Sequence, residues 1–342
     1  EFKVDTITNR DGSYGPQVCG VTTFRSSGVT LPSGPTEFRG GRGRGVIHGG
    51  RDNPTFYADM DFIEIATTGN TSEFGNLRSK GQSAYGGTAS STRGLVCGGY
   101  ESPAAATVSA IQYYTFSSGG GANDFGDLSS ARQSNAGASN NVRRLSFGGS
   151  PSPTGAATNT IQYVTIASTG DADEFGSLTE RVFNTGSGVS NGTRAFQMSG
   201  NSTEVGDDSK KIHVVTIATT GDAVKFGELI TERNAHAGCS NSTRGLSWCG
   251  QTPSNINNIE YFELASEGNG VDFGDASATK DYLGALASHT RGLCGGGQTP
   301  TKINVIEFVN IATTGDAIDF GDLTVSRRFC AGFSDVHGGL AQ

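Results

Sequence analysis

A six-residue pattern of apolar and polar side chains recurs along the chain. Positions one, three, four and six of each copy are apolar, and positions two and five are polar in nearly all of them. The copies are MDFIEI (60–65), IQYYTF (111–116), IQYVTI (161–166), IHVVTI (212–217), IEYFEL (259–264) and IEFVNI (306–311). Short runs with apolar residues on both faces are typical of strands buried on both sides. We therefore predict a buried β-strand in each copy.

A second predicted strand precedes each of these runs and ends on a glycine. Its copies include RGVIHGG (44–50) and RGLVCGG (93–99), and their last glycines lie 47 to 51 residues apart. Glycine at a fixed strand position indicates an unusual φ or a close backbone approach. The glycines of this column are Gly50, Gly99, Gly149, Gly200, Gly250 and Gly297.

Two further strands complete each repeat. A turn such as TTGDA (313–317) predicts a tight hairpin after the buried strand. The next strand ends on a Phe-Gly pair, and we expect its phenylalanine to pack between adjacent sheets. A fourth strand, as in RNAHAGCSNSTRG (233–245), leads into the next repeat. The recurring phenylalanines are Phe74, Phe125, Phe175, Phe226, Phe273 and Phe320.

The period fits a four-stranded propeller blade of the kelch or WD type. One small antiparallel sheet cannot bury both faces, whereas blades stacked around an axis can. The C-terminal segment 327–342 resembles the fourth strand but has no repeat after it, and the first repeat starts at Arg44 without such a strand. We predict an all-β fold: a six-bladed β-propeller of four-stranded antiparallel, kelch-like blades over residues 41–342, closed by the C-terminal strand in the first blade.

The loops after the glycine column differ from copy to copy, while the turns at the other end vary little. Alternate connections of a propeller lie on opposite faces, so the variable loops are expected to share one rim. Diverse loops on a rigid scaffold are typical of a binding surface. The predicted binding residues on this rim are Arg51, Asp52, Tyr57, Tyr100, Glu101, Asp207, Asp208, Asn255, Gln298 and Lys302.

Residues 1–40 do not match the repeat. Short bursts of alternating residues separated by Gly, Pro and Ser predict an extended N-terminal arm without its own core. Two interpretations stay open: an arm that becomes ordered by docking on a larger assembly, which we favour, and a flexible tail.

Composition narrows the class of protein. The chain has 52 glycines, 34% hydrophobic residues and few helix formers, so almost no helix is expected. A net charge of −8 argues against nucleic acid as the partner, although FRGGRGRG places Arg39, Arg42 and Arg44 close together. Membrane insertion is not expected, because no apolar run is long enough to cross a bilayer. The six cysteines are expected to be buried free thiols rather than disulfides, because their repeat positions lie far apart.

Motifs that carry chemistry are weak in this sequence. The five histidines occupy different repeat columns, and there is no CxxC pair for zinc. Asp171, Asp173 and Glu174 could serve as calcium ligands, but they lack EF-hand spacing and are better interpreted as a solvated turn. The repeated DFG has no kinase motif around it. We therefore predict a protein that is not an enzyme, with no catalytic residues, no metal and no cofactor.

The motifs VDTITNRDGSYGPQVCGVTTF and LPSGPTEFRGGRGRG, followed by repeated TTGDA and DFGDL phrases, resemble structural proteins of marine tailed bacteriophages, notably cyanophages. The resemblance covers essentially the whole chain. It implies a tail or fibre-type component on the virion exterior, present in multiple copies and attached to other virion proteins through residues 1–40. Two functions remain open: attachment to a host surface glycan or protein through the variable rim, and a purely structural role in the tail, neck or capsid.

Overall fold

The structure is a computed structural model. It describes residues 43–82, 88–102, 105–151, 157–183, 187–204 and 206–340. The chain divides into residues 1–38 and residues 39–342. The predicted docking arm, residues 1–40, and Arg42 lie outside the described residues, so the description below concerns the second unit.

The described residues form an all-β fold of antiparallel sheets. Their only helical segment is the short 3-10 helix η1 (Gly338–Leu340), which confirms the predicted lack of helix. Among the described residues there is no helix that is long and apolar enough to cross a membrane.

The first large sheet joins the two ends of this unit. Its strand order is β31 (Ala331–Ser334), β1 (Arg44–His48), β4 (Asp59–Glu64) and β5 (Ser72–Asn76). Val46 of β1 lies opposite Phe333 of β31 on one side and Phe62 of β4 on the other. The prediction that a C-terminal strand completes the first repeat is therefore confirmed.

The other large sheets repeat the same strand order. β7 (Thr88–Ala89), β8 (Arg93–Ser102), β9 (Ala106–Thr115) and β10 (Asn123–Asp127) form one, to which β6 (Lys80–Gln82) is added. An eight-stranded sheet contains β11 (Ala136–Ser139), β12 (Arg143–Phe147), β13 (Thr158–Thr165), β14 (Asp173–Phe183), β15 (Ser187–Ser190), β16 (Arg194–Ser202), β17 (Asp207–Thr216) and β18 (Val224–Glu228). One four-stranded sheet has the order β19 (Ala237–Ser240), β20 (Arg244–Trp248), β23 (Asn258–Glu263) and β24 (Val271–Asp275). The last has the order β25 (Gly284–Ala287), β26 (Arg291–Gly295), β29 (Val305–Asn310) and β30 (Ile318–Asp322).

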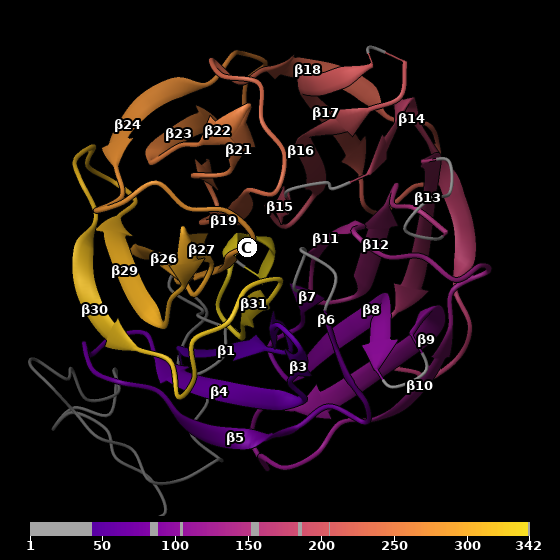
Figure 1. The fold of residues 1–342 in the computed structure, drawn as a ribbon. Helices are drawn as coiled ribbons and strands as arrows, with labels where there is room; N and C mark the ends of the chain where they lie inside the picture. The colour runs from indigo at the N-terminus through magenta and orange to yellow at the C-terminus, as the bar shows by residue number, and fades with distance from the viewer. Residues whose placement is uncertain are drawn as a thin grey trace, which may run out of the picture. The chain divides into compact units, whose positions relative to one another are not determined.

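The sheets are arranged around a common centre (Figure 1). The short strands β7, β11, β15, β19 and β31 lie near this centre, whereas β5, β10, β24 and β30 lie at the periphery (Figure 1). Each short inner strand contacts the next, in the order β7, β11, β15, β19, β25, β31 and back to β7. Strands from both ends of the described chain thus lie side by side.

The recurring phenylalanines fill the space between neighbouring repeats, as predicted. Phe175 of β14 belongs to one buried cluster with Val215, Ile217 and Ala223 of the next repeat. Five of the six phenylalanines are at most 4% exposed, while Phe74 is only half-buried. The core of this unit therefore lies between neighbouring repeats.

The TTGDA-type turns do more than close a hairpin. In one copy the N–H of Gly170 donates to the carbonyl of Phe125 in the preceding sheet, and the N–H of Asp127 donates to the Asp171 carboxylate, at 2.8 and 2.9 Å. The N–H of Gly69 makes the same contact to the carbonyl of Phe320 at 2.7 Å. The last repeat is thus joined to the first by the contact that joins neighbours in sequence.

The glycine column has the predicted unusual backbone. All six glycines have φ between +96° and +119°. A Cβ at Gly250 would lie 2.7 Å from the carbonyl oxygen of Asn234. The column therefore needs glycine both for its φ and for a close backbone approach.

Position two of the buried strand carries polar residues, and its burial confirms the prediction of a strand buried on both sides. The polar residues there are buried rather than exposed, and Glu260 is 0% accessible. A polar side chain at such a place needs partners in the interior, because an uncompensated buried charge is costly. The six residues of this column are Asp61, Gln112, Gln162, His213, Glu260 and Glu307.

Candidate binding site at the loop-bearing end

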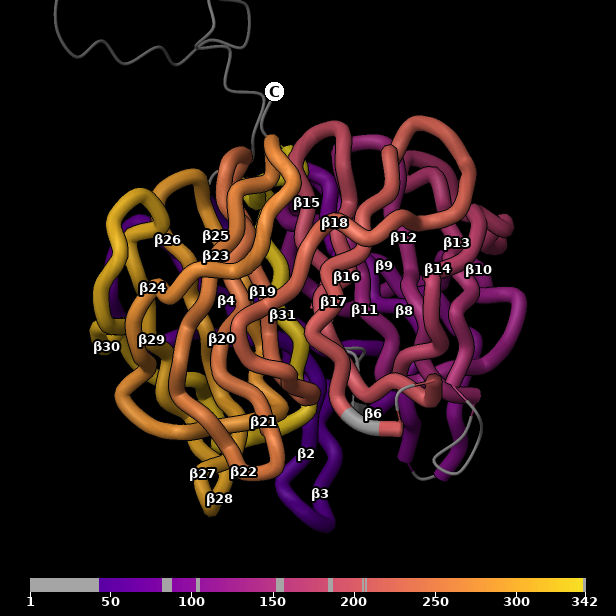
Figure 2. Tube along the Cα trace, turned by 90° about the horizontal axis from the view of Figure 1, so that it is seen from above, coloured from indigo at the N-terminus to yellow at the C-terminus, as the bar shows by residue number. Residues whose placement is uncertain are grey.

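The variable loops include three two-stranded hairpins. They are β2 (Arg51–Asp52) with β3 (Thr55–Phe56), β21 (Gln251–Thr252) with β22 (Ser254–Asn255), and β27 (Gln298–Thr299) with β28 (Thr301–Lys302). Figure 2 shows all three at the same end of the sheets. We call this the loop-bearing end.

A repeated backbone conformation places two aromatic residues at this end. Tyr282 and Phe329 occupy equivalent positions before inner strands and have φ of +55° and +58°. The N–H of Phe329 donates to the carbonyl of Tyr282, and the N–H of Tyr282 donates to that of Ala235, both at 2.8 Å. A bulky residue with positive φ is uncommon, and here backbone hydrogen bonds between repeats fix it.

Two arginines pack on these rings. The Tyr282 and Phe329 ring centroids are 4.0 Å apart, and the Arg51 and Arg328 guanidiniums lie 4.7 and 4.9 Å from the Phe329 centroid. Arg51 also lies 5.7 Å from the Phe56 centroid. These five residues form what we call the aromatic–arginine cluster, whose cation–π contacts hold the guanidiniums in place.

A cavity of about 470 Å³ adjoins this cluster. Its aromatic walls are Phe56 and Tyr100, whose ring centroids are 6.1 Å apart, and Arg51 and Gln133 supply polar groups. The volume is in the range of small-ligand sites, in which apolar walls and a few polar groups are typical. The remaining lining residues are Asn53, Pro54, Ser102 and Ala105.

The structure brings several predicted binding residues together. Lys302 Nζ lies 3.2 Å from Asp52 Oδ1, which joins hairpins from the last and first repeats. Asn255 Nδ2 donates to the carbonyl of Gln298 at 3.1 Å. Four predicted residues thus bind one another across adjacent loops.

Other predicted residues have local partners. Asn234 Nδ2 donates to both carboxylate oxygens of Asp208 at 2.9 Å, and Ser79 Oγ donates to the Glu101 carboxylate. Tyr57 is half-buried, and burial followed by the Asp52 charge raises its pKa. Asp207 begins β17, but its side chain lies outside the described part of the chain.

The charges around the cluster are mixed. Burial raises the pKa of Asp281 to about 6, and the Arg328 guanidinium acts in the opposite direction. Burial raises the pKa of Tyr282, and the charges of Asp281 and Asp208 raise it further, whereas those of Arg328 and Arg51 lower it. A surface with acids, arginines, amides and aromatic rings is better suited to binding a ligand with several polar groups than to binding a simple ion.

The sequence prediction missed Tyr282, Arg328, Phe329 and Gln133. These residues precede inner strands and belong to the segments that vary less among the repeats, so loop diversity did not point to them. A signal was present, however, because a Tyr or Phe stands where another copy has Ala235. Large aromatic residues at a repeat position that is otherwise small indicate a local role.

Away from this end, the described residues line a cavity of about 520 Å³ beside one TTGDA-type turn, with Phe226 as its one aromatic residue and Arg194 among its polar ones. The cavity on the axis holds only about 30 Å³, close to one water molecule, and His337 is its one histidine. Asp171 accepts a backbone N–H as described above, and no three His, Cys, Asp or Glu side chains among the described residues are grouped to hold a metal ion. Cys97, Cys239, Cys249, Cys294 and Cys330 are buried free thiols, as predicted.

No family model and no curated protein matches the chain.

Proposed function

We propose that residues 41–342 form a closed six-bladed β-propeller that binds a surface molecule at its loop-bearing end. The pairing of β31 with β1, the cyclic contacts of the inner strands and the hydrogen bond from Gly69 to Phe320 support this architecture. A rigid ring with free loops at one end is suited to recognition, because the scaffold does not depend on the loops.

The observation that carries the proposal is the cavity beside the aromatic–arginine cluster. It combines ring faces from Phe56 and Tyr100 with donors from Arg51 and Gln133. Ring faces and planar donors can bind a sugar or a protein side chain. The proposed role is non-enzymatic, reversible attachment of a phage particle to a host surface glycan or protein.

The virion setting rests on the resemblance to marine phage structural proteins. In this setting residues 1–40 attach the propeller to other virion proteins, and the loop-bearing end faces outward. Several copies on one particle would strengthen weak single contacts through multivalent binding.

A second candidate function, a structural role in the tail, neck or capsid, has one observation in its favour. Val224, Val271 and Ile318 begin the outermost strands of three consecutive repeats and are 58%, 49% and 62% exposed. The equivalent residues of the other repeats are Ser72, Asn123 and Asp173. Exposed apolar side chains on one side of the ring are suited to packing against another virion protein.

One pair of variants separates the two candidates. Phe56→Ala with Tyr100→Ala removes both aromatic walls of the cavity, whereas V224S, V271N and I318D insert the residues of the other repeats on the outer strands. If the attachment function is correct, the first variant loses saturable binding to bacterial cells and the second keeps it. The opposite result, with the second variant failing to enter particles and the first binding normally, would support the structural role.

A further inference from the structure

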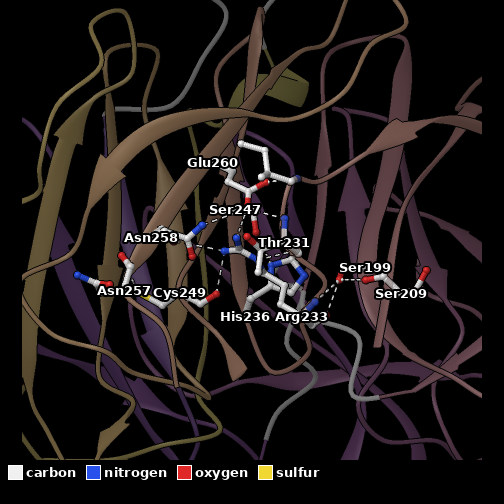
Figure 3. A network of polar contacts seen from close by, with 11 residues as sticks. Ser199, Ser209, Thr231, Arg233, His236, Ser247, Cys249, Asn257, Asn258 and Glu260 are labelled. Atoms are coloured by element: carbon white, nitrogen blue, oxygen red, sulfur yellow. Dashed lines mark hydrogen bonds and ion pairs between the residues drawn. The ribbon is translucent and has the colours of Figure 1, made fainter. Parts of the chain in front are cut away.

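Buried cations from the segments between repeats meet an acid on the next buried strand. Arg233 pairs with Glu260, Lys280 with Glu307 and Arg327 with Asp61. All six side chains are at most 2% exposed. Figure 3 shows the first pair, in which Arg233 also donates to the carbonyl oxygens of Cys249 and Asn258 at 2.9 and 3.2 Å.

The corresponding pair in the third repeat lacks its acid. Arg132 is 2% exposed and donates to the carbonyl of Gly148 at 3.3 Å, the same kind of backbone contact that Arg233 makes to Cys249. The position of Glu260 is occupied here by Gln162, which is neutral. Arg132 Nε is buried without a hydrogen-bond partner.

A second arginine lies on the same sheet. Arg144 of β12 is 1% exposed, where four other repeats have Gly45, Gly94, Gly245 and Gly292. Its Nε donates to Thr88 Oγ1 at 3.1 Å, and its Nη2 is buried without a partner.

The strand register places this arginine on the face that carries Gln162. Ser146 lies directly opposite Gln162, and Arg144 lies two residues before Ser146. Because side chains alternate along a strand, all three project from one face of the sheet. The charge of Arg144 also acts on Arg132, where it adds to burial in lowering the pKa to about 10.

The two positive charges have no compensating acid in the described chain. Neither arginine forms an ion pair there, and the nearby Cys97 thiol stays neutral because burial raises its pKa to about 11. The internal segments outside the description, 83–87, 103–104, 152–156, 184–186 and 205, contain no Asp or Glu. Buried charges are normally paired, because leaving one unpaired in a protein interior is strongly destabilising.

We propose that Arg132 Nε and Arg144 Nη2 bind a small inorganic anion, with chloride as the probe, in the interior beside Gln162. The anion takes the place of the carboxylate that Glu260, Glu307 and Asp61 supply in three other repeats. This inference is independent of the proposed attachment function.

The test compares thermal unfolding of the full chain in sodium chloride and in sodium gluconate at equal ionic strength. Binding to the folded state alone raises the melting temperature. We expect a value higher by about 2–4 °C in chloride. Crystals soaked in bromide should give an anomalous peak between the two arginines. Equal melting temperatures in the two salts, or only water at this position, would overturn the proposal.

Three variants make the test specific. Gln162→Glu supplies the missing carboxylate, so its melting temperature should no longer differ between the salts. Arg144→Gly restores the residue of four other repeats and should also reduce the difference, which keeps the test valid if Gln162→Glu does not fold. Glu260→Gln is the matched control at a paired position and should create a new chloride dependence. A chloride effect that is unchanged in both Gln162→Glu and Arg144→Gly would mean that the anion binds elsewhere.

Discussion

The two ends of the sheets follow different rules. At the opposite end, where the TTGDA-type turns lie, the same contact recurs: Arg143 Nη1 donates to the carbonyls of Ile217 and Ala218 in the next repeat at 3.1 and 2.9 Å. Arg93, Arg244 and Arg291 make equivalent contacts. At the loop-bearing end some backbone hydrogen bonds also recur, but side-chain ion pairs between loops, such as that of Asp52 with Lys302, occur once among the described residues.

This difference separates residues that join neighbouring repeats from residues that are free to change. A repeated contact is required at every junction, so each copy keeps the same arginine. A contact found once can be lost while the contacts that recur at the other junctions between repeats stay in place. We therefore expect substitutions of repeated residues to lower stability, and substitutions at the loop-bearing end to alter binding with little loss of stability.

The largest expected effect comes from the core between neighbouring repeats. Phe175→Ala should lower the free energy of unfolding by about 3–5 kcal/mol, because it leaves a cavity against Val215 and Ile217. Chemical denaturation of the two proteins measures this change. Phe74→Ala is the matched control and should cost less, because Phe74 is only half-buried. Equal losses at the two positions would contradict the role assigned to burial.

The second effect depends on pH. His236 is 0% exposed, its Nε2 donates to the carbonyl of Met198, and burial followed by the Arg233 charge lowers its pKa to about 3. Between pH 6.5 and 3 the unfolded chain binds a proton here that the folded chain does not. Stability is therefore lost as the pH falls below 6.5, by about 1.4 kcal/mol per pH unit for this histidine.

His236→Asn tests this pH dependence with a residue that another repeat has at the same position. The equivalent residue of the third repeat is Asn135, whose Nδ2 donates to Ser146 Oγ at 2.5 Å, as His236 pairs with Ser247 at 2.8 Å. Between pH 6.5 and 4.5, the free energy of unfolding should fall by about 2–3 kcal/mol less in the variant than in the parent, as measured by chemical denaturation. The same acid sensitivity in both proteins would show that other groups account for it.

The sequence predicted the repeated features well and the single ones poorly. The strand expected at 259–264 is found at 258–263, and the glycine column has the expected φ, because six copies reinforce each pattern. Tyr282 and Arg328 were missed, because their contact partners come from different repeats and no local pattern marks them. The ion pair of Glu260 was also missed, because its partner Arg233 lies 27 residues away in the sequence.

A smaller effect is expected from the repeated arginines. Arg143→Gln should cost about 1–2 kcal/mol, because two charge-assisted hydrogen bonds to carbonyls are lost. Arg194 is the internal comparison, since its Nη1 reaches only the carbonyl of Leu264, at 3.4 Å. Arg194→Gln should therefore cost less in the same denaturation experiment, and a larger loss at Arg194 would disprove this ranking.

The smallest effect is expected at the loop-bearing end, where Asp52 and Lys302 are 44% and 26% exposed. A double-mutant cycle with Asp52→Asn and Lys302→Gln should give a coupling energy of about 0.5 kcal/mol that decreases with salt, as is usual for exposed ion pairs. This pair joins the last repeat to the first, as Arg291 does at the other end. A salt-independent coupling as large as the loss in Arg143→Gln would mean that the variable loops also hold the last repeat to the first, and the distinction between the two ends would fail.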